Sequence, residues 1–241
     1  MTLDEILASL FPDGYDVVRD GGLVMGSGAL AGGGRAEVIG VTDRTPLGVD
    51  GALKLSGHVI DALGRGGNGP ILVLVDSDSQ RMSKRDELLG LNEFLAHLAK
   101  TLIHADLSGR PTIGVLYGHT AAGAFIATAL AARVLVALPG AEPEVMDLPS
   151  MARVTKLSVD VLKEKARSTP VFAPGLDNLA QTGGVSITWN PDEPLSDQLR
   201  TLLDAGHGGV DRRDALGRER HGRPKAADIA ERVRELAIRT G

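Results

Sequence analysis

The chain of 241 residues carries a net charge of −5, and 31 of its residues are glycine, whereas aromatic residues make up 3% and hydrophobic residues 43%. This apolar share indicates a globular protein with a core of Ala, Leu, Val and Ile, not a disordered chain. A negative, aromatic-poor chain is not expected to bind nucleic acid, and the absence of cysteine excludes disulfides, thiolate metal sites and cysteine nucleophiles.

The first residues predict one short helix followed by strands. Thr2-Leu3-Asp4-Glu5 has the pattern of a capping box, and Pro12-Asp13-Gly14 is typical of a helix end. Residues 23–25 and 38–41 are β-like runs, and the glycine-rich segment 26–34 between them does not favour a helix. We therefore expect a meander of two or three strands over residues 15–43.

The middle of the chain predicts alternating helices and strands. Residues 71–75 form a continuous apolar run, typical of a strand buried on both faces, and leucines recur every three or four residues over 85–105, as in an amphipathic helix. The predicted elements are a helix at 52–63, a strand at 71–75, a polar loop at 76–79, a helix at 85–105, a strand at 112–116, a helix at 121–132 and a strand at 134–138. This order implies a parallel core with right-handed crossovers.

Beyond residue 139 the pattern is less regular. The expected elements are two short helices within 151–168, a loop at 172–184, a short strand through Val185, Ile187 and Trp189, and a helix around 195–203. The segment 204–224 is rich in Gly, Arg and Asp, which predicts an exposed or mobile connector. The expected organisation is a domain of residues 1–204, a connector of residues 205–224 and a C-terminal helix of residues 225–241.

The segment 117–125 carries the most information about function. A buried strand ends there, Gly118 and Gly123 bracket a turn, and a helix of small residues begins with Ala122 and Ala124. Main-chain N–H groups at a helix start are unpaired, and small side chains let an oxygen approach them, as in an oxyanion hole. Close packing of a helix on a sheet selects the same small residues, and the sequence alone leaves both interpretations open.

Other polar residues are weaker candidates. His119 lies in the same turn and is a candidate general base or substrate ligand, although a local hydrogen bond is the simpler interpretation. Asp76 and Asp78 follow a predicted strand and are candidate Mg²⁺ ligands, but we favour solvated or helix-capping roles for them, and we expect no metal site. The remaining histidines are scattered along the chain: His58, His97, His104, His207 and His221.

The other motifs argue against further functions. Gly32-Gly33-Gly34 is not followed by Gly-Lys-Ser/Thr, which argues against a nucleotide-binding phosphate loop. No Gly-x-Ser-x-Gly occurs, so a serine hydrolase has no support in the sequence. The basic cluster from Arg212 to Arg223 is interleaved with acids, so we expect a solvated surface, with docking of an acidic carrier protein as the alternative. The acidic start of the chain and the lack of an apolar run of ~20 residues predict a cytoplasmic protein without membrane attachment.

Several segments together resemble one family. They are residues 69–76, the helix after them, and residues 111–115, 118–125 and 141–146. Over about residues 20–190 the chain resembles the γ subunit of biotin-independent malonate decarboxylase and, more widely, the C-terminal half of acyl-CoA carboxyltransferases of the crotonase superfamily. Residues 121–125 stand where carboxyltransferases carry a Tyr-Gly-Gly-Ala-Tyr-like stretch.

The resemblance implies an α/β fold of the crotonase-like (ClpP/crotonase) type, a ββα spiral with flanking helices. It implies a carboxy-lyase that, with the β subunit, decarboxylates malonyl-S-acyl carrier protein to acetyl-S-acyl carrier protein and CO₂. An α subunit and the acyl carrier protein would belong to the same complex. The carrier protein would supply a phosphoribosyl-dephospho-CoA arm, no cofactor would bind this chain directly, and the active site would lie between the β and γ subunits.

The resemblance makes Gly118, His119, Ala122, Gly123 and Ala124 the candidate catalytic residues, with main-chain N–H groups stabilising an enolate. One departure is Ala122, where the family motif has a second glycine. In carboxyltransferases, the oxyanion hole of the C-terminal half serves biotin, and the other half serves the thioester. Without biotin, Gly123 and Ala124 would face either the thioester or the departing carboxylate.

Three alternatives stay open at this point. A stand-alone crotonase-type hydratase or isomerase would need a carboxylate pair near the hole, for which Glu142 and Glu144 are the candidates. A non-catalytic half would complete the β subunit's site and dock the carrier protein. A biotin-dependent carboxyltransferase half would pass the carboxyl group to biotin.

Overall fold

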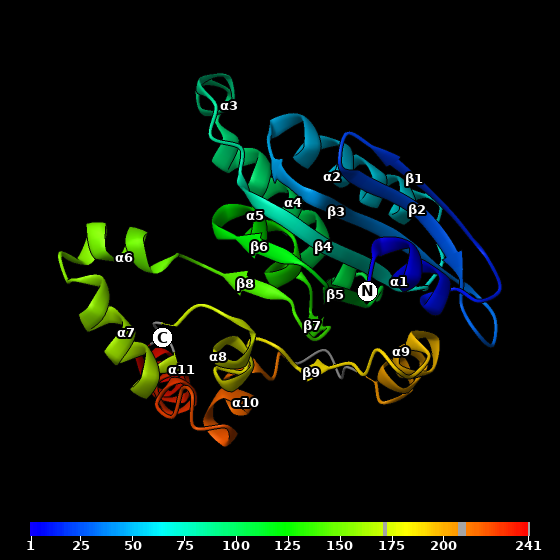
Figure 1. The fold of residues 1–241 in the computed structure, drawn as a ribbon. Helices are drawn as coiled ribbons and strands as arrows, with labels where there is room; N and C mark the ends of the chain where they lie inside the picture. The colour runs from blue at the N-terminus through cyan, green and yellow to red at the C-terminus, as the bar shows by residue number, and fades with distance from the viewer. Residues whose placement is uncertain (171–172, 207–210, 241) are drawn as a thin grey trace.

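A seven-stranded sheet forms the centre of the computed structural model, which describes residues 1–170, 173–206 and 211–240. Its strands follow the order β1-β2-β3-β4-β5-β7-β9, antiparallel from β1 to β3 and parallel from β3 to β9 (Figure 1). The strands are β1 Tyr15–Asp20, β2 Leu23–Ala29, β3 Arg35–Leu47, β4 Ile71–Gln80, β5 Thr112–Leu116, β7 Val134–Ala137 and β9 Ile187–Thr188. The predicted meander and parallel core are both confirmed.

Helices cover both faces of this sheet, and a second small sheet pairs β6 His119–Ala121 with β8 Glu142–Glu144. In the described part of the chain, none of the helices is long and apolar enough to cross a membrane. The helices are α1 Leu3–Leu10, α2 Val49–Gly64, α3 Lys84–Leu89, α4 Leu91–Leu107, α5 Ala122–Ala127, α6 Leu148–Thr155, α7 Val159–Ser168, α8 Leu176–Gln181, α9 Leu195–Asp204, α10 Arg213–Glu219, α11 Ala226–Thr240 and the 3₁₀ turn η1 Ala129–Ala131.

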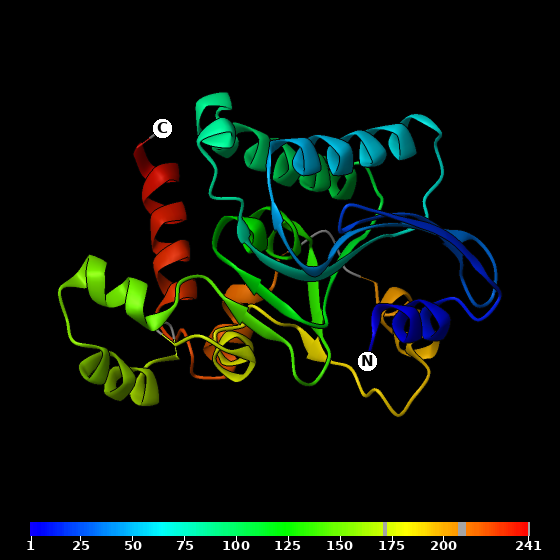
Figure 2. The same ribbon diagram turned by 45° about the horizontal axis from the view of Figure 1, so that its top comes forward.

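Strand β4 shows why the centre of the sheet is apolar throughout. Its side chains alternate between the two faces, since successive residues of a strand point to opposite sides. Ile71 and Val73 belong to the core with α2 and α4, whereas Leu72 and Leu74 belong to the core with α1 and α9. Figure 2 shows α2 and α4 on one side of the sheet and α1 and α9 on the other. The continuous run of apolar residues in β4 therefore serves two cores.

Two predicted boundaries around β4 were wrong. Residues 76–79, expected as a polar loop, continue β4 to Gln80. The helix expected at 85–105 is two helices, because Gly90 takes a left-handed conformation with φ of 83° and ends α3 before α4 begins. Leu88 belongs to the leucine pattern but is 77% exposed, so the buried face starts only with Leu91.

Two further segments differ from expectation. The helix predicted at 121–132 is strand β6 up to residue 121, then the short α5 and η1, because Thr128 leaves helical geometry and its hydroxyl donates to the carbonyl of Ala124 at 2.7 Å. The loop predicted at 172–184 contains α8, although residue 172 lies outside the described residues. The two short helices expected within 151–168 are confirmed as α6 and α7.

The segment predicted as an exposed connector is attached to the main body. Helix α10 lies within it, and Arg213 donates to the carbonyl of Leu130 at 3.0 Å. Arg220 donates hydrogen bonds to three more main-chain carbonyls, those of Ala180, Val185 and Ser186, at 2.7, 2.6 and 2.8 Å. The basic cluster is therefore not simply a solvated surface, because two of its arginines fix α10 against the body. Residues 207–210, and with them His207, lie outside the described residues.

Glycine at position 40 is predicted to be indispensable for the pairing of β3 with β4. A Cβ there would lie 2.3 Å from the carbonyl oxygen of Leu74 on the neighbouring strand. Gly40→Ala should therefore lower the free energy of unfolding by about 1–3 kcal/mol in urea denaturation. Gly57→Ala on α2, where a Cβ meets nothing within 4 Å, is the matched control and should raise it by about 0.5–1 kcal/mol. Equal effects at both positions would contradict this packing.

Candidate functional site

The segment singled out by sequence forms a turn from the main sheet into the small one. After β5, Tyr117 and Gly118 lead into β6, which pairs in parallel with β8 so that His119 faces Glu142 across the ladder. Helix α5 begins directly after β6. Figure 1 shows β6 beside the far end of β4, so the turn lies over the part of β4 that sequence assigned to a loop.

Asp76 holds the start of this turn. Its Oδ1 accepts the main-chain N–H of His119 at 3.0 Å. A Cβ on Gly118 would lie 2.2 Å from the same carboxylate oxygen, so only glycine allows the carboxylate to come this close. This contact gives Asp76 a structural role and explains Gly118 without a ligand.

Two further contacts continue along β4. The hydroxyls of Ser77 and Thr120, both fully buried, lie 2.8 Å apart, and Oε1 of Gln80 accepts the main-chain N–H of Gly123 at 2.8 Å. In each of the three contacts, the residue on the turn lies 43 positions after its partner on β4. Sequence reasoning missed Ser77, Gln80 and Thr120, because a local pattern carries no signal for pairing across that distance.

Backbone strain is located at the first residue of α5. Ala122 has a φ of 48°, in the left-handed region that favours glycine, whereas Ala121 before it is extended with φ of −139°. Strained positions of this kind are frequent at functional sites, where the surrounding structure holds them. The strained residue is the one at which the motif of the resembled family has a second glycine.

The expected main-chain donors are placed together, but one of them is engaged. The N–H of Gly123 already donates to Gln80, and a Cβ on Gly123 would lie 3.0 Å from Oε1 of Gln80 and 3.2 Å from Cδ1 of Leu95. The side chain of Ala124 is fully buried against the main core. The small residues thus allow the close packing of α5 on β4 and α4.

His119 lies at the wall of a shallow hollow of about 330 Å³, with Arg44, Glu142 and Glu144 also in its lining. Nδ1 of His119 is 4.0 Å from Oε2 of Glu142, beyond hydrogen-bond range, while Arg44 donates to the same oxygen at 3.3 Å. The Glu142 side chain is 70% exposed. Glu142 therefore lies beside the turn as a solvated partner of Arg44, a residue that sequence did not single out.

The remaining polar candidates do not join this site. His58 pairs with Glu37 at 3.2 Å, His97 and His104 lie on α4, and Asp78 is exposed. Among the described residues, no three His, Asp or Glu side chains are arranged to hold a metal ion. Burial raises the pKa of the Tyr117 phenol to about 12, so Tyr117 stays protonated at neutral pH.

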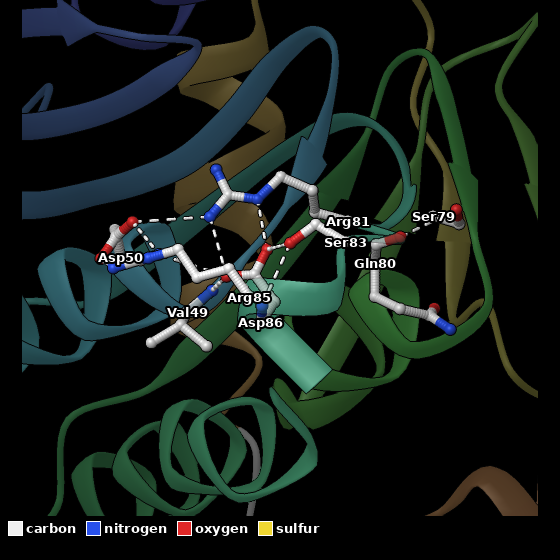
Figure 3. A network of polar contacts seen from close by, with 8 residues as sticks. All are labelled: Val49, Asp50, Ser79, Gln80, Arg81, Ser83, Arg85 and Asp86. Atoms are coloured by element: carbon white, nitrogen blue, oxygen red, sulfur yellow. Dashed lines mark hydrogen bonds and ion pairs between the residues drawn. The ribbon is translucent and has the colours of Figure 1, made fainter. Parts of the chain in front are cut away.

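The end of β4 is fixed by a buried carboxylate. Asp86 on α3 has a fully buried side chain and accepts hydrogen bonds from both Nε and Nη2 of Arg81, from Oγ of Ser83 at 2.8 Å and from the N–H of Val49 at 3.4 Å (Figure 3). The last contact caps the N-terminus of α2, whose own N-cap residue is a glycine. Asp50 accepts from Arg85 in the same network. Hydrogen bonds from Arg81 hold the pKa of Asp86 well below its usual range.

The chain is similar to known sequences of one family. A family model described as malonate decarboxylase gamma subunit matches residues 42–237. The malonyl-S-ACP:biotin-protein carboxyltransferase MADD of Malonomonas rubra is 30% identical over 167 residues, which are 64% of this chain and 57% of that protein. The chain thus spans less than two thirds of this curated relative.

Solved structures show the same fold. A Pseudomonas malonate decarboxylase hetero-tetramer in complex with coenzyme A contains a chain with a TM-score of 0.78 and 26% identity, covering 96% of this chain and 98% of that one. The MdcD–MdcE hetero-dimer of Pseudomonas malonate decarboxylase gives 0.75 and 25%, covering 98% of both chains. A transcarboxylase 12S chain at 19% identity, covering 84% of this chain and 39% of that one with a TM-score of 0.67, shares the fold alone. The expected crotonase-like α/β fold is confirmed.

Loss of the Asp86 charge is predicted to destabilise the protein at neutral pH. Asp86→Asn leaves Arg81 without its buried charged partner. It should lower the free energy of unfolding, measured by chemical denaturation at pH 7, by about 3 kcal/mol. Because the native pKa of Asp86 is lowered, this contribution is present above its unfolded pKa of about 3.9 and is lost as the pH falls further. Asp50→Asn, on an exposed partner in the same network, should cost much less. Equal losses in the two variants would contradict the role of Asp86.

Relief of strain at position 122 is predicted to stabilise the fold. Ala122→Gly removes the cost of placing a Cβ at positive φ and should raise the free energy of unfolding by about 1 kcal/mol. Ala121→Gly, at ordinary φ, should lower it. A loss of stability in Ala122→Gly as large as that in the control would rule out strain at this position.

Proposed function

The chain belongs to the malonate decarboxylase gamma-subunit family, and we propose that it forms, with a β partner subunit, the site that decarboxylates malonyl-S-acyl carrier protein to acetyl-S-acyl carrier protein and CO₂. The observation that carries this proposal is the strained turn from β6 into α5, held on β4 by three side-chain hydrogen bonds. The start of this turn, at His119, borders a hollow that Glu142 also lines.

The chemistry requires stabilisation of negative charge that appears on the thioester. When the bond between the carboxylate carbon and the α-carbon breaks, CO₂ leaves and the electron pair moves to the thioester oxygen, forming an enolate that then takes a proton at the α-carbon. Hydrogen-bond donors aimed at this oxygen stabilise the transition state more than the substrate, which is the condition for catalysis. The main-chain groups of Ala122, Gly123 and Ala124 lie at the candidate turn, with Gly118 and His119 shaping its entrance.

The comparisons support a heteromeric assembly for the proposed activity. The similar Pseudomonas chains are part of a hetero-dimer and a hetero-tetramer, and the Malonomonas relative is named for a malonyl-S-ACP substrate. In the proposed complex, the acyl carrier protein supplies the thioester through its phosphoribosyl-dephospho-CoA arm, an α subunit belongs to the same assembly, and this chain binds no cofactor itself.

Exposed apolar side chains are consistent with a partner subunit. Helices α6, α7 and α11 lie beyond β8 on one side of the molecule in both ribbon views. Exposed apolar side chains that gather on one side of a protein mark interaction sites. The side chains on this side that are at least 38% exposed are Val145, Met146, Val154, Leu157, Val161, Ile229, Val233, Leu236 and Ile238.

Carboxyl transfer to a biotin protein is the second candidate, favoured by the name of the Malonomonas relative. The two activities differ in what accepts the carboxyl group, since decarboxylation releases CO₂ without biotin. The hydratase alternative is weakened, because Glu142 is a solvated partner of Arg44 and not half of an enclosed acid–base pair.

The test is release of CO₂ from malonyl-S-acyl carrier protein by the purified β partner, with and without this chain. We expect release only when both chains are present, and no inhibition by avidin, because no biotin takes part. The same rate without this chain would refute the proposed activity. Inhibition by avidin would favour the carboxyltransferase, and hydration of an enoyl-CoA by the isolated chain would favour the stand-alone enzyme.

Substitution of Gly123 is predicted to abolish turnover without dissociating the complex. A side chain there meets Gln80 and Leu95 and displaces the hydrogen bond between position 123 and β4. Gly123→Val should lower CO₂ release by at least about 100-fold, while gel filtration shows the same complex. Gly57→Ala on α2 should leave the rate unchanged. A near-normal rate for Gly123→Val would contradict the placement of the site at this turn.

A further inference from the structure

We propose that the side-chain amide of Gln80 is a catalytic hydrogen-bond donor, with its Nε2 directed at the thioester oxygen on which the enolate charge develops. This inference rests on the proposed function and assigns the donor to a residue on β4. It starts from a conflict at the turn. The N–H of Gly123, the expected donor to the substrate, already donates to Oε1 of Gln80 at 2.8 Å. Any donation to the substrate from this position therefore involves Gly123 and Gln80 as a hydrogen-bonded pair.

The hydrogen bond from Gly123 fixes the orientation of the Gln80 amide. A main-chain N–H can only donate, so the atom that faces Gly123 must be the carbonyl oxygen of the side chain. Nε2 consequently points away from the turn. Its contact among the described residues is the sulfur of Met82 at 3.9 Å, a weak acceptor on an exposed side chain. Among the described residues no stronger acceptor engages Nε2, so its N–H groups are oriented and a ligand oxygen can replace the sulfur.

The position of the amide is set from both sides. Gln80 is the last residue of β4, and Arg81 directly after it is held by the buried carboxylate of Asp86. Figure 3 shows the Gln80 side chain directed away from this network, and its Oε1 meets Gly123 of α5. A half-buried side chain that is anchored at its backbone and at its carbonyl oxygen is a preorganised donor, which is what an oxyanion site requires.

An amide suits this reaction better than a cationic side chain. A hydrogen bond accepted by the carbonyl of an amide polarises it, which strengthens the donors on its nitrogen. A neutral donor near the thioester oxygen stabilises the developing enolate without holding the substrate carboxylate, which must lose its charge as CO₂ leaves. The donation from Gly123 to Oε1 and from Nε2 to the enolate oxygen forms one continuous chain of hydrogen bonds.

The test separates the two atoms of the amide. Gln80→Glu keeps an oxygen that accepts from Gly123 but removes the donor, whereas Gln80→Met keeps the volume and removes both. In the complex with the β partner and malonyl-S-acyl carrier protein, we expect kcat to fall about 100-fold in both variants with KM changed less than about 3-fold, since the lost bond acts in the transition state. Gln181→Glu, which adds the same charge on the exposed end of α8, is the control and should behave as wild type.

The outcomes distinguish this inference from the proposed function. If Gln80→Glu retains kcat within about 3-fold of wild type while Gln80→Met is inactive, Gln80 only holds the turn and the inference is wrong. If both variants retain kcat, the inference is equally wrong. Should Gln80→Glu not assemble with the partner, retained activity of Gln80→Met would still overturn the inference, because that variant has no donor. Absence of CO₂ release by the wild-type complex, in contrast, would refute the proposed function itself.

Discussion

The second half of β4 holds the turn between β6 and α5 through three side-chain contacts, each to the residue 43 positions further along the chain. The rest of the site depends on this pairing. It requires glycine at position 118, it keeps Ala122 at positive φ, and it engages the N–H of Gly123. The buried Asp86 in turn fixes the end of β4, so a stability element and the candidate site share one strand.

The apolar first half of β4 could be predicted from sequence, but its polar second half could not. A run of apolar residues identifies a strand buried on both faces from local information. Asp76, Ser77 and Gln80 bind a segment far along the chain through their polar side chains, and a local pattern cannot distinguish such a strand from a loop. The break at Gly90 was missed for a related reason, since the leucine repeat continues across it while Leu88 faces solvent.

The turn of residues 118–124 was predicted more accurately than the contacts that hold it. The glycines and alanines of residues 118–124 identified the turn, because close approach to a backbone selects small residues in any context. They did not show which contacts require that closeness: Asp76 against Gly118 and Gln80 against Gly123. An exposed connector was also expected where Arg213 and Arg220 bind carbonyls of the main body, because composition alone does not show where an arginine side chain points.

The hold of β4 on the turn is tested most directly by residue-resolved amide hydrogen exchange at positions 119 and 123, since both amides donate to side chains of β4. We expect slow exchange at both positions in the wild-type chain. Asp76→Ala should accelerate exchange at position 119 by at least about 10-fold and Gln80→Ala should do so at position 123, each with a smaller effect at the other. Exchange that is already fast in the wild type, or unchanged in both variants, would contradict the claim that β4 positions the turn.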